Sequence, residues 1–347
     1  MGFSWNKKKV LVTGGASFIG SHLVDALVER GAEVVVIDDL SSGSLDHIQG
    51  QIDANAIEFV HADLRETART KEALRKIDIL FHLAADHGGR GYVDTHQAGP
   101  ASNLYLDGLV LWEGLRAGVD KIVFASSGCV YPNHLQNDAD QQIYLTEDLV
   151  RPPYDSDNMY GWAKLMGELT LRAYHAEYGL KAASCRYFTV YGPRAKENHA
   201  VIALIARAFV RQNPFEIWGT GNQIRNWTYV SDIVEGTILA AEKIDDGTAV
   251  NLGTTERIRV LDAVQMVMDL SGHHVPIATK PEMPTGPMNR VASNELAKQL
   301  LGWEPKVLFR EGLRLSYEWY CANKKQDDVR YILENGGLIE RKVAAKA

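Results

Sequence analysis

Long apolar runs, paired cysteines and clusters of one charge are absent from this 347-residue sequence. Because no stretch reaches ~18 uninterrupted apolar residues, we expect no membrane-spanning helix and no membrane partner. The three cysteines, Cys129, Cys185 and Cys321, are odd in number and widely spaced, which argues against a disulfide framework and against a C-x-x-C metal site. We therefore expect a cytoplasmic protein that holds no metal.

Basic residues are too few and too scattered for a nucleic-acid-binding surface. Lys and Arg total 37 against 44 Asp and Glu, a formal net charge of −7, and the longest block of like charge is Lys7-Lys8-Lys9. A nucleic acid is therefore not an expected partner. Hydrophobic residues make up 46% and charged residues 23% of the chain, close to the averages of compact globular proteins.

Short apolar segments alternate with amphipathic ones through the first half of the chain. The predicted strands are 10–12, 34–37, 57–60, 79–83, 122–125 and 182–187, and the predicted helices between them are 21–30, 71–76, 103–117 and 160–178. Continuous apolar strands that alternate with helices are typical of a parallel sheet covered on both faces. The sequence therefore predicts an α/β fold with a doubly wound parallel sheet.

The regular alternation of strands and helices ends at about residue 192. Loops rich in Gly, Pro and Asn follow, with helical segments at 201–211 and 232–243. This composition is typical of a smaller substrate-binding region. We predict a dinucleotide-binding domain over residues 1–192, a mainly substrate-binding region over 193–325, and an unassigned tail over 326–347.

A glycine-rich turn links the first predicted strand to the first helix. Residues 13–20 read T-G-G-A-S-F-I-G, a context in which backbone N–H groups and a helix N-terminus meet a pyrophosphate. Asp38 ends the second strand, where a carboxylate accepts a hydrogen bond from an adenosine ribose and favours NAD over NADP. Asp63-Leu64 follows the third strand and either holds the adenine or begins a helix as its N-cap. The predicted cofactor residues in these segments are Gly14, Ser17, Phe18, Ile19, Gly20, Asp38, Asp63 and Leu64.

A second motif places a phenol and an ammonium group together. Tyr160 and Lys164 lie four residues apart and therefore share one face of a helix. A cation at that spacing lowers the pKa of a phenol, which turns a tyrosine into a base near neutral pH. Ser126-Ser127 follows another predicted strand and supplies a hydroxyl beside a sugar oxygen.

Together these residues resemble the extended short-chain dehydrogenase/reductase superfamily, in particular its nucleotide-sugar epimerases and dehydratases. The resemblance spans about residues 9 to 320 and also includes His82-Leu83-Ala84-Ala85 and Tyr191-Gly192-Pro193-Arg194. It implies a Rossmann-like fold, a homodimer formed through helices 103–117 and 160–178, and a tightly bound NAD that oxidises a sugar carbon transiently. In the resemblance Ser127 and Tyr160 act on the C4 hydroxyl, Lys164 binds the nicotinamide ribose, and Ala84 and Ala85 line the cofactor site.

The residues after Ser127 separate the branches of this superfamily. Its 4,6-dehydratases carry Asp-Glu there, and this chain has Gly128-Cys129, which argues against elimination of water. Residues 84–92 (A-A-D-H-G-G-R-G-Y) and 127–132 (S-G-C-V-Y-P) resemble the GDP-mannose 3,5-epimerase branch, in which the cysteine exchanges protons with carbons beside a C4 ketone. The alternative is that Cys129 is a small buried packing residue.

The chain also departs from the patterns of that branch, of the wider family and of the glycine motif, at one place each. His199 aligns where the branch has an acid/base lysine, with Lys196 nearby; a loop histidine without a role is the alternative. Thr189 replaces an asparagine that helps to hold the diphosphate, and Ser17 replaces a glycine of the related T-G-x-x-G-x-x-G motif.

The resemblance places Arg225 and Arg290 on the nucleotide diphosphate, where guanidinium groups form bidentate contacts. Gly88 and Arg90 follow the fourth strand, at the sheet edge where ligands of open α/β sheets bind, and we expect them near the hexose. A solvent-facing position is the alternative for Arg90.

We therefore predict an NAD-dependent nucleotide-sugar epimerase that acts through a 4-keto intermediate, with a GDP-hexose 3,5-epimerase as the first hypothesis. A UDP-hexose or UDP-hexuronate 4-epimerase is the alternative. A 4,6-dehydratase and a non-catalytic NAD-binding protein are further, weaker alternatives.

Overall fold

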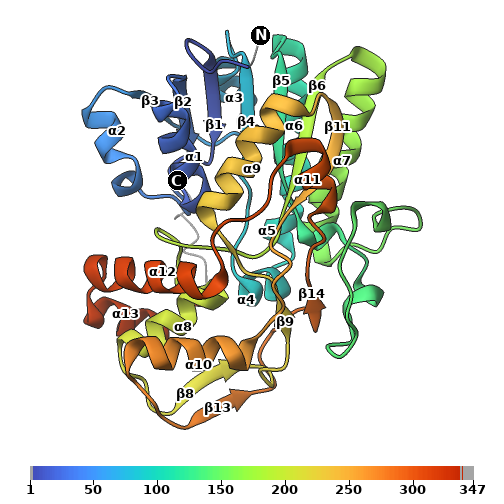
Figure 1. Cartoon of the computed structure of the whole chain (residues 1–347). Coiled ribbons are helices and arrows are strands. Elements are labelled where there is room, and N and C mark those ends of the chain that lie inside the picture. The colour runs from blue at the N-terminus through green and yellow to red at the C-terminus, as the bar shows by residue number, and fades with distance from the viewer. Residues whose placement is uncertain (1–2, 337, 339–347) are drawn as a thin grey trace.

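The computed structural model describes residues 3–336 and 338, and it contains a seven-stranded parallel sheet with helices on both faces (Figure 1). The strand order is β11-β6-β5-β4-β1-β2-β3, and every neighbouring pair is parallel. The strands are β1 (Lys9–Thr13), β2 (Glu33–Asp38), β3 (Ile57–His61), β4 (Ile79–His82), β5 (Lys121–Ser127), β6 (Lys181–Tyr187) and β11 (Asp246–Leu252). The predicted doubly wound, Rossmann-like sheet is confirmed.

Side chains alternate between two cores because successive residues of a strand point to opposite faces. In β1, Val10 and Val12 pack in one cluster with α1 (Phe18–Glu29), α9 (Val230–Lys243) and α11 (Glu295–Leu301). Leu11 packs in a second cluster with α6 (Asn103–Ala117) and α7 (Asn158–Tyr178). Both faces of the strand are thus buried, which explains its continuous apolar sequence.

The remaining elements of the sheet region are short. They are η1 (Leu45–His47), α2 (Gln49–Asp53), α3 (Thr67–Ala73), α4 (Arg90–Thr95), α5 (Ala98–Ala101), η2 (Gly128–Val130), η3 (Asn133–Gln136) and η4 (Glu147–Leu149). Two of them bear on the site: α4 follows the β4 loop and η2 follows β5. Helix α4 has no counterpart among the predicted helices, because six residues are too few to show a helical repeat.

The C-terminal region has its own hydrophobic core and lies at the carboxyl edge of the sheet (Figure 1). Its elements are β7 (Val190–Tyr191), α8 (Ala200–Phe209), β8 (Phe215–Trp218), β9 (Ile224–Arg225), β10 (Thr228–Tyr229), β12 (Ile258–Arg259), α10 (Val260–Ser271), β13 (Ile277–Lys280), β14 (Asn289–Arg290), α12 (Phe309–Asn323) and α13 (Gln326–Glu334).

The boundary predicted at residue 192 divides the sequence, but elements from both sides of it pack together in the sheet layer. Strand β11 comes from the later segment and pairs with β6, and α9 and α11 from the same segment cover one face of the sheet. The predicted tail contributes α13, and its residues 337 and 339–347 lie outside the described part of the chain. The division at 192 therefore stays a proposal.

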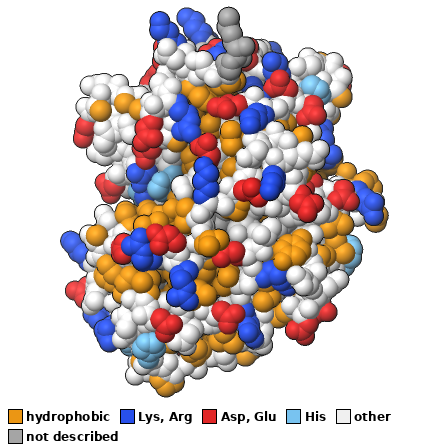
Figure 2. Space-filling model, viewed as in Figure 1, with side chains coloured by type: hydrophobic (Ala, Val, Ile, Leu, Met, Phe, Trp, Pro, Cys, Tyr) orange, Lys and Arg blue, Asp and Glu red, His pale blue; other side chains and the backbone are white. Residues whose placement is uncertain are grey.

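On the face shown in Figure 2, basic and acidic side chains are interspersed, and no broad basic patch is visible there. Within residues 3–336 and 338, we find no helix whose length and hydropathy would let it cross a membrane.

Candidate functional site

A cavity of about 460 Å³ runs between the carboxyl edge of the sheet and the C-terminal region. Its volume falls within the range of small-molecule sites. All the residues predicted from the sequence line this one cavity: Gly14, Ser17, Phe18, Ile19, Gly20, Asp38, Asp63, Leu64, Ala84, Ala85, Gly88, Arg90, Ser127, Cys129, Tyr160, Lys164, Thr189, His199, Arg225 and Arg290.

The glycine turn has the close backbone packing that a dinucleotide site requires. Gly14 has a φ of +71°, and a Cβ there would lie 3.0 Å from the Ala84 nitrogen. A Cβ on Gly20 would collide with the Gly14 carbonyl oxygen. Helix α1 begins at Phe18 with Ser17 as its N-cap, so its N-terminus opens onto the cavity. These residues fit a pyrophosphate.

Asp38 lies at the end of β2, beside this turn. Its Oδ2 accepts hydrogen bonds from the Ala16 backbone (3.0 Å) and the Ser17 hydroxyl (3.4 Å), and its Oδ1 accepts from the Leu40 backbone (2.8 Å). Burial raises the pKa of this carboxyl, although the hydrogen bonds oppose that effect. The arrangement holds a carboxylate where a dinucleotide's ribose hydroxyls would lie.

We expect Asp38→Asn to reduce the preference for NAD over NADP by roughly tenfold or more, because the carboxylate repels a 2′-phosphate. The measurement is the ratio of the two dinucleotides released when the purified protein is denatured. Asp63→Asn is the matched control, since that carboxylate also lines the cavity but is paired with Arg65 at 2.7 Å. Wild-type protein that releases mainly NADP would refute this assignment.

Asp63 and Leu64 line the cavity, but Asp63 is not a helix N-cap. Helix α3 begins at Thr67 and its N-cap residue is Glu66, so that alternative is wrong. Asp63 instead accepts hydrogen bonds from the backbone and the guanidinium of Arg65. Burial acts to raise the pKa of Asp63, but these hydrogen bonds outweigh it and lower the pKa. Adenine binding by Asp63 stays a prediction.

Tyr160 and Ser127 meet where α7 begins against η2. The Ser127 hydroxyl acts to lower the pKa of Tyr160, and Ser127 Oγ accepts a hydrogen bond from the Cys129 backbone at 3.1 Å. Gly161 permits this contact, because a Cβ there would collide with the Cys129 carbonyl oxygen. The glycine next to Tyr160 is therefore a packing requirement of the site.

Lys164 differs from the sequence expectation in its effect on Tyr160. Its Nζ lies 5.9 Å from the Tyr160 ring centroid and 3.4 Å from the Asp107 carboxylate, with both of those charged groups buried. The pKa of Tyr160 is raised, chiefly by burial and then by its electrostatic interactions with Cys129 and Asp107. The expected lowering does not hold in this state, because burial disfavours the charged phenolate.

Cys129 is half-buried in the cavity wall, in contact with a guanidinium. Arg290 donates to Cys129 Sγ (3.2 Å), to Gln136 (2.6 Å) and to Asp157 (2.9 Å). Cationic neighbours stabilise a thiolate. Cys129 also packs against Tyr92, Val93 and Tyr160, so its acid/base role stays a prediction. The diphosphate role of Arg290 stays a prediction, since all three of its nitrogens bind protein partners here.

Asp157 joins two arginines in the cavity. Arg90 donates to it through Nη1 (2.6 Å) and Nη2 (3.1 Å), and Arg290 binds the same carboxylate. Burial acts to raise the pKa of Asp157, but the charges of Arg290 and Arg90 outweigh it and lower the pKa to about 2. Arg90 is therefore held in the cavity wall on α4, and the solvent-facing alternative is wrong.

Arg225 and Thr189 face the same cavity from the C-terminal side. The Arg225 guanidinium donates to the carbonyls of Ile224 (2.7 Å) and Thr285 (2.8 Å). Burial, with repulsion from Arg290 and Arg90, lowers the pKa of Arg225 to about 9. An anionic ligand would relieve this repulsion.

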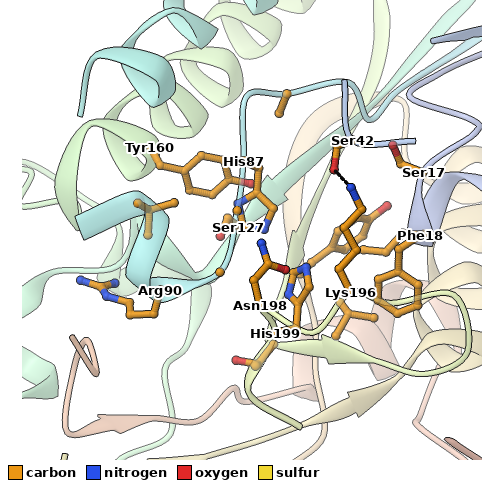
Figure 3. A pocket seen from close by; sticks show the side chains of 18 of the residues that line it. Ser17, Phe18, Ser42, His87, Arg90, Ser127, Tyr160, Lys196, Asn198 and His199 are labelled. Atoms are coloured by element: carbon orange, nitrogen blue, oxygen red, sulfur yellow. Dashed lines mark hydrogen bonds between the residues drawn. The ribbon is translucent and has the colours of Figure 1, made fainter. Parts of the chain in front are cut away.

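His199 and His87 lie opposite each other, with ring centroids 5.8 Å apart, and His87 lies 4.8 Å from the Tyr160 ring (Figure 3). Gly89 allows the two loops to meet, because a Cβ there would collide with the Asn198 carbonyl oxygen. Burial lowers the pKa of His199 to about 4, so its imidazole is neutral at pH 7.

Lys196 points away from His199, toward the dinucleotide side of the cavity. Its Nζ donates to Ser42 Oγ at 3.2 Å, a contact drawn in Figure 3. His199 is thus the one of these two residues whose ring meets His87, which in turn lies against Tyr160.

Sequence reasoning missed three polar residues that organise the cavity: Asp107, Gln136 and Asp157. Each contacts a predicted residue from a segment far away in the chain. Asp107 lies within an otherwise apolar stretch of its helix, and a buried carboxylate needs a partner. That was the one available signal.

Comparison with known proteins identifies the family. The sequence profile of the NAD dependent epimerase/dehydratase family matches residues 10–253. The chain belongs to this family. It is therefore an enzyme that uses NAD as its cofactor and acts on nucleotide sugars, and the glycine turn and Asp38 fit that cofactor.

Several relatives of the family are similar over most of this chain. GDP-mannose 3,5-epimerase of Arabidopsis thaliana is 30% identical, covering 90% of this chain and 81% of the relative. An uncharacterized UDP-glucose epimerase of Bacillus subtilis is 32% identical, covering 88% and 95%. The solved structure of UDP-glucuronic acid 4-epimerase from Bacillus cereus, with UDP-glucuronic acid and NAD, has a TM-score of 0.79 at 29% identity and covers 90% and 98%.

Proposed function

We propose that this enzyme is a GDP-hexose 3,5-epimerase that acts through a 4-keto intermediate. The observation that carries the proposal is the presence of two further proton-exchanging groups, Cys129 and His199, in the cavity that holds Tyr160, Ser127 and Lys164. A 4-epimerase needs only the last three. The family relationship to GDP-mannose 3,5-epimerase supports the same choice.

The first step assigned to the cavity is removal of the C4 hydroxyl proton. NAD, when bound, accepts a hydride from a sugar carbon and later returns it. Tyr160 is the group assigned to take the hydroxyl proton, and the Ser127 hydroxyl, which acts to lower the pKa of that phenol, is assigned to the same sugar oxygen. Loss of this proton together with the hydride on C4 turns that carbon into a ketone.

The second step is proton exchange at the carbons beside that ketone, whose C–H bonds the ketone makes acidic. Neutral His199 accepts a proton, and Cys129 is the group that takes or returns a proton from its own side of the cavity. Arg290, which donates to Cys129 Sγ, stabilises the negative charge while the proton is away. A proton returned from the other face inverts the carbon.

The C-terminal wall supplies groups for the nucleotide. Arg225 is the arginine assigned to the diphosphate, since its charge lacks a carboxylate partner within salt-bridge distance among the described residues and is repelled by two other guanidiniums. Beyond it, three residues that line the cavity carry buried polar atoms without hydrogen-bond partners among the described residues: Arg207 Nε, Gln223 Oε1 and Trp227 Nε1. We assign this end of the cavity to the nucleobase, because buried polar atoms need partners.

A 4,6-dehydratase remains poorly supported. The position after Ser127 carries Gly128-Cys129, and the nearby carboxylate of Asp157 is held in two arginine contacts. A charged, doubly paired carboxylate is a poor proton donor for a leaving hydroxyl.

The test is incubation of the purified enzyme with GDP-mannose in deuterium oxide, followed by mass spectrometry and proton NMR of the sugar. The proposal expects deuterium at C3, C5 or both, with inversion there. Inversion at C4 without deuterium, observed with UDP-glucose or UDP-glucuronic acid, would instead establish the second candidate, a UDP-hexose or UDP-hexuronate 4-epimerase. That candidate is favoured by the similarity to UDP-glucuronic acid 4-epimerase.

We also infer a homodimer formed by α6 and α7. These adjacent helices expose several large hydrophobic side chains: Leu104, Tyr105, Trp112, Trp162, Met166 and Tyr178. Gathered exposed apolar side chains mark interaction surfaces.

We expect Met166→Glu to convert the dimer to a monomer, because the substitution places a charge against apolar surface in both copies. Multi-angle light scattering after gel filtration gives the mass. Tyr331→Glu is the matched control, since Tyr331 is 69% exposed but lies on α13, away from this pair of helices. A wild-type mass of one chain would contradict the inferred dimer.

A further inference from the structure

Four buried polar side chains form a continuous line that ends at Lys164. Thr13 Oγ1 lies 2.8 Å from His82 Nδ1, His82 Nε2 lies 3.0 Å from Asp107 Oδ1, and Asp107 Oδ2 lies 3.4 Å from Lys164 Nζ. Each of the four side chains is at most 1% exposed. The line joins β1, β4, α6 and α7, so it crosses the layer beneath the candidate site.

The hydrogen bonds in this line are all donated in the same direction, from Thr13 to His82 and from His82 to Asp107. Thr13 Oγ1 accepts the backbone N–H groups of Leu83 and Ala84, both at 3.0 Å, which uses its lone pairs and leaves its own hydrogen for His82 Nδ1. Burial lowers the pKa of His82, so the ring is neutral. Because Nδ1 accepts from Thr13, the single ring hydrogen lies on Nε2. That hydrogen is donated to Asp107.

This line of hydrogen bonds therefore orients the Asp107 carboxylate. It provides no path for a proton to solvent, because its other end lies at backbone groups in the interior. Asp107 receives one N–H from His82 and faces the Lys164 ammonium with its other oxygen. A buried ammonium and a buried carboxylate at this distance largely cancel each other's field on a third group. That third group is Tyr160, whose ring centroid is 5.9 Å from the Lys164 nitrogen.

We propose that Asp107, oriented by Thr13 and His82, is a positioning residue that holds the Lys164 ammonium and limits how strongly it promotes ionisation of Tyr160. The proposal rests on the proposed function in one respect, the role of Tyr160 as the base. It assigns a function to a residue outside the glycine turn, the tyrosine-lysine motif and the serine.

Other groups also face Tyr160 and influence its titration. They are Cys129 on η2, His87 in the loop after β4, Tyr187 on β6, Lys164 on α7 and the Ser127 hydroxyl at the end of β5. None of them is substituted in an Asp107 variant, so a shift in that variant reports the Asp107 charge together with its hold on the Lys164 ammonium.

The first experiment compares the wild type with Asp107→Asn, which keeps the volume and the hydrogen bond to His82 but removes the charge. Absorbance of NADH formed in a single turnover is followed against pH after adding the sugar, GDP-mannose or UDP-glucose, that the wild type oxidises. We expect the acid limb of the profile to move to lower pH by about one unit, because a lost negative charge makes the phenol more acidic. An unmoved limb with a uniformly lower rate would overturn the proposal.

Glu168→Gln is the matched control. Glu168 is also a fully buried carboxylate on α7, paired with Arg186 at 2.8 Å. Its loss should reduce thermal stability and leave the acid limb in place. An equal shift in both variants would show that the shift follows from general destabilisation, and it would also overturn the proposal.

A second measurement is independent of activity. Thermal unfolding is compared for Asp107→Asn, Lys164→Met and the double variant. Each single substitution leaves a buried partner uncompensated and should lower the melting temperature by roughly 5 °C or more, whereas the double variant should lose less than the sum of both. Additive losses would refute the pairing of Asp107 with Lys164. If the wild type oxidised neither sugar, the proposed function would fail while this cycle still decided the pairing.

Discussion

Tyr160→Phe should lower turnover by about a hundredfold or more while the bound NAD and the fold are retained, because only the phenolic oxygen is lost. Tyr160 is only 8% exposed, and a phenylalanine ring fills the same space as the tyrosine ring. Turnover is measured by product formation, and retention of NAD by the dinucleotide released on denaturation.

The matched control for this substitution is Tyr187→Phe. Tyr187 also lines the cavity, and its hydroxyl is bonded to Thr237 at 2.9 Å, so the variant removes a buried phenolic oxygen that has a structural partner. We expect it to lower stability and to keep most of the turnover. A Tyr160→Phe enzyme that retained more than about a tenth of wild-type turnover would exclude Tyr160 as the base.

Cys129→Ser should separate the two steps of the proposed reaction. NADH absorbance should still appear on adding GDP-mannose, because Tyr160, Ser127 and Lys164 are intact. Deuterium incorporation at the carbon that Cys129 serves should fall by about a hundredfold or more, because a hydroxyl is much harder to deprotonate than a thiol. The measurement is mass spectrometry of the recovered sugar after incubation in deuterium oxide.

His199→Asn is the companion variant. It should impair exchange at the other carbon and leave NADH formation largely unchanged, since the neutral imidazole stands at the start of α8 and Cys129 lies in η2. Cys185→Ser is the control for loss of a thiol, because Cys185 is fully buried in the sheet and has no contact with the cavity. Exchange at the wild-type rate in Cys129→Ser would return Cys129 to a packing role.

Several features of this enzyme follow from local sequence alone. The glycine turn, the spacing of Tyr160 and Lys164, and Asp38 at a strand end each depend on residues close together in the chain, where backbone geometry decides which side chains share a face. The alternation of apolar strands and helices likewise predicts the sheet, because each strand must be buried on both sides. Because the carboxyl ends of parallel strands meet at one edge of a sheet, the predicted site residues line a single cavity there.

Other features depend on segments that meet only when the chain is folded. The seventh strand, β11, pairs with β6 across a long sequence separation, and its mixed composition showed no strand pattern. His87 faces His199 because Gly89 lets two distant loops touch. Arg290 contacts Cys129 from 161 positions away. Sequence spacing carries no information about such contacts.

Electrostatics at the site depends most of all on tertiary structure. From sequence, Lys164 is a cation one turn from Tyr160, and it should make the phenol more acidic. In the fold, burial and the Asp107 carboxylate outweigh it, and the pKa of Tyr160 is raised. The local chain thus determined which groups are present, while only the folded chain decided their net effect, because the field at an atom sums over all neighbouring charges and the solvent they exclude.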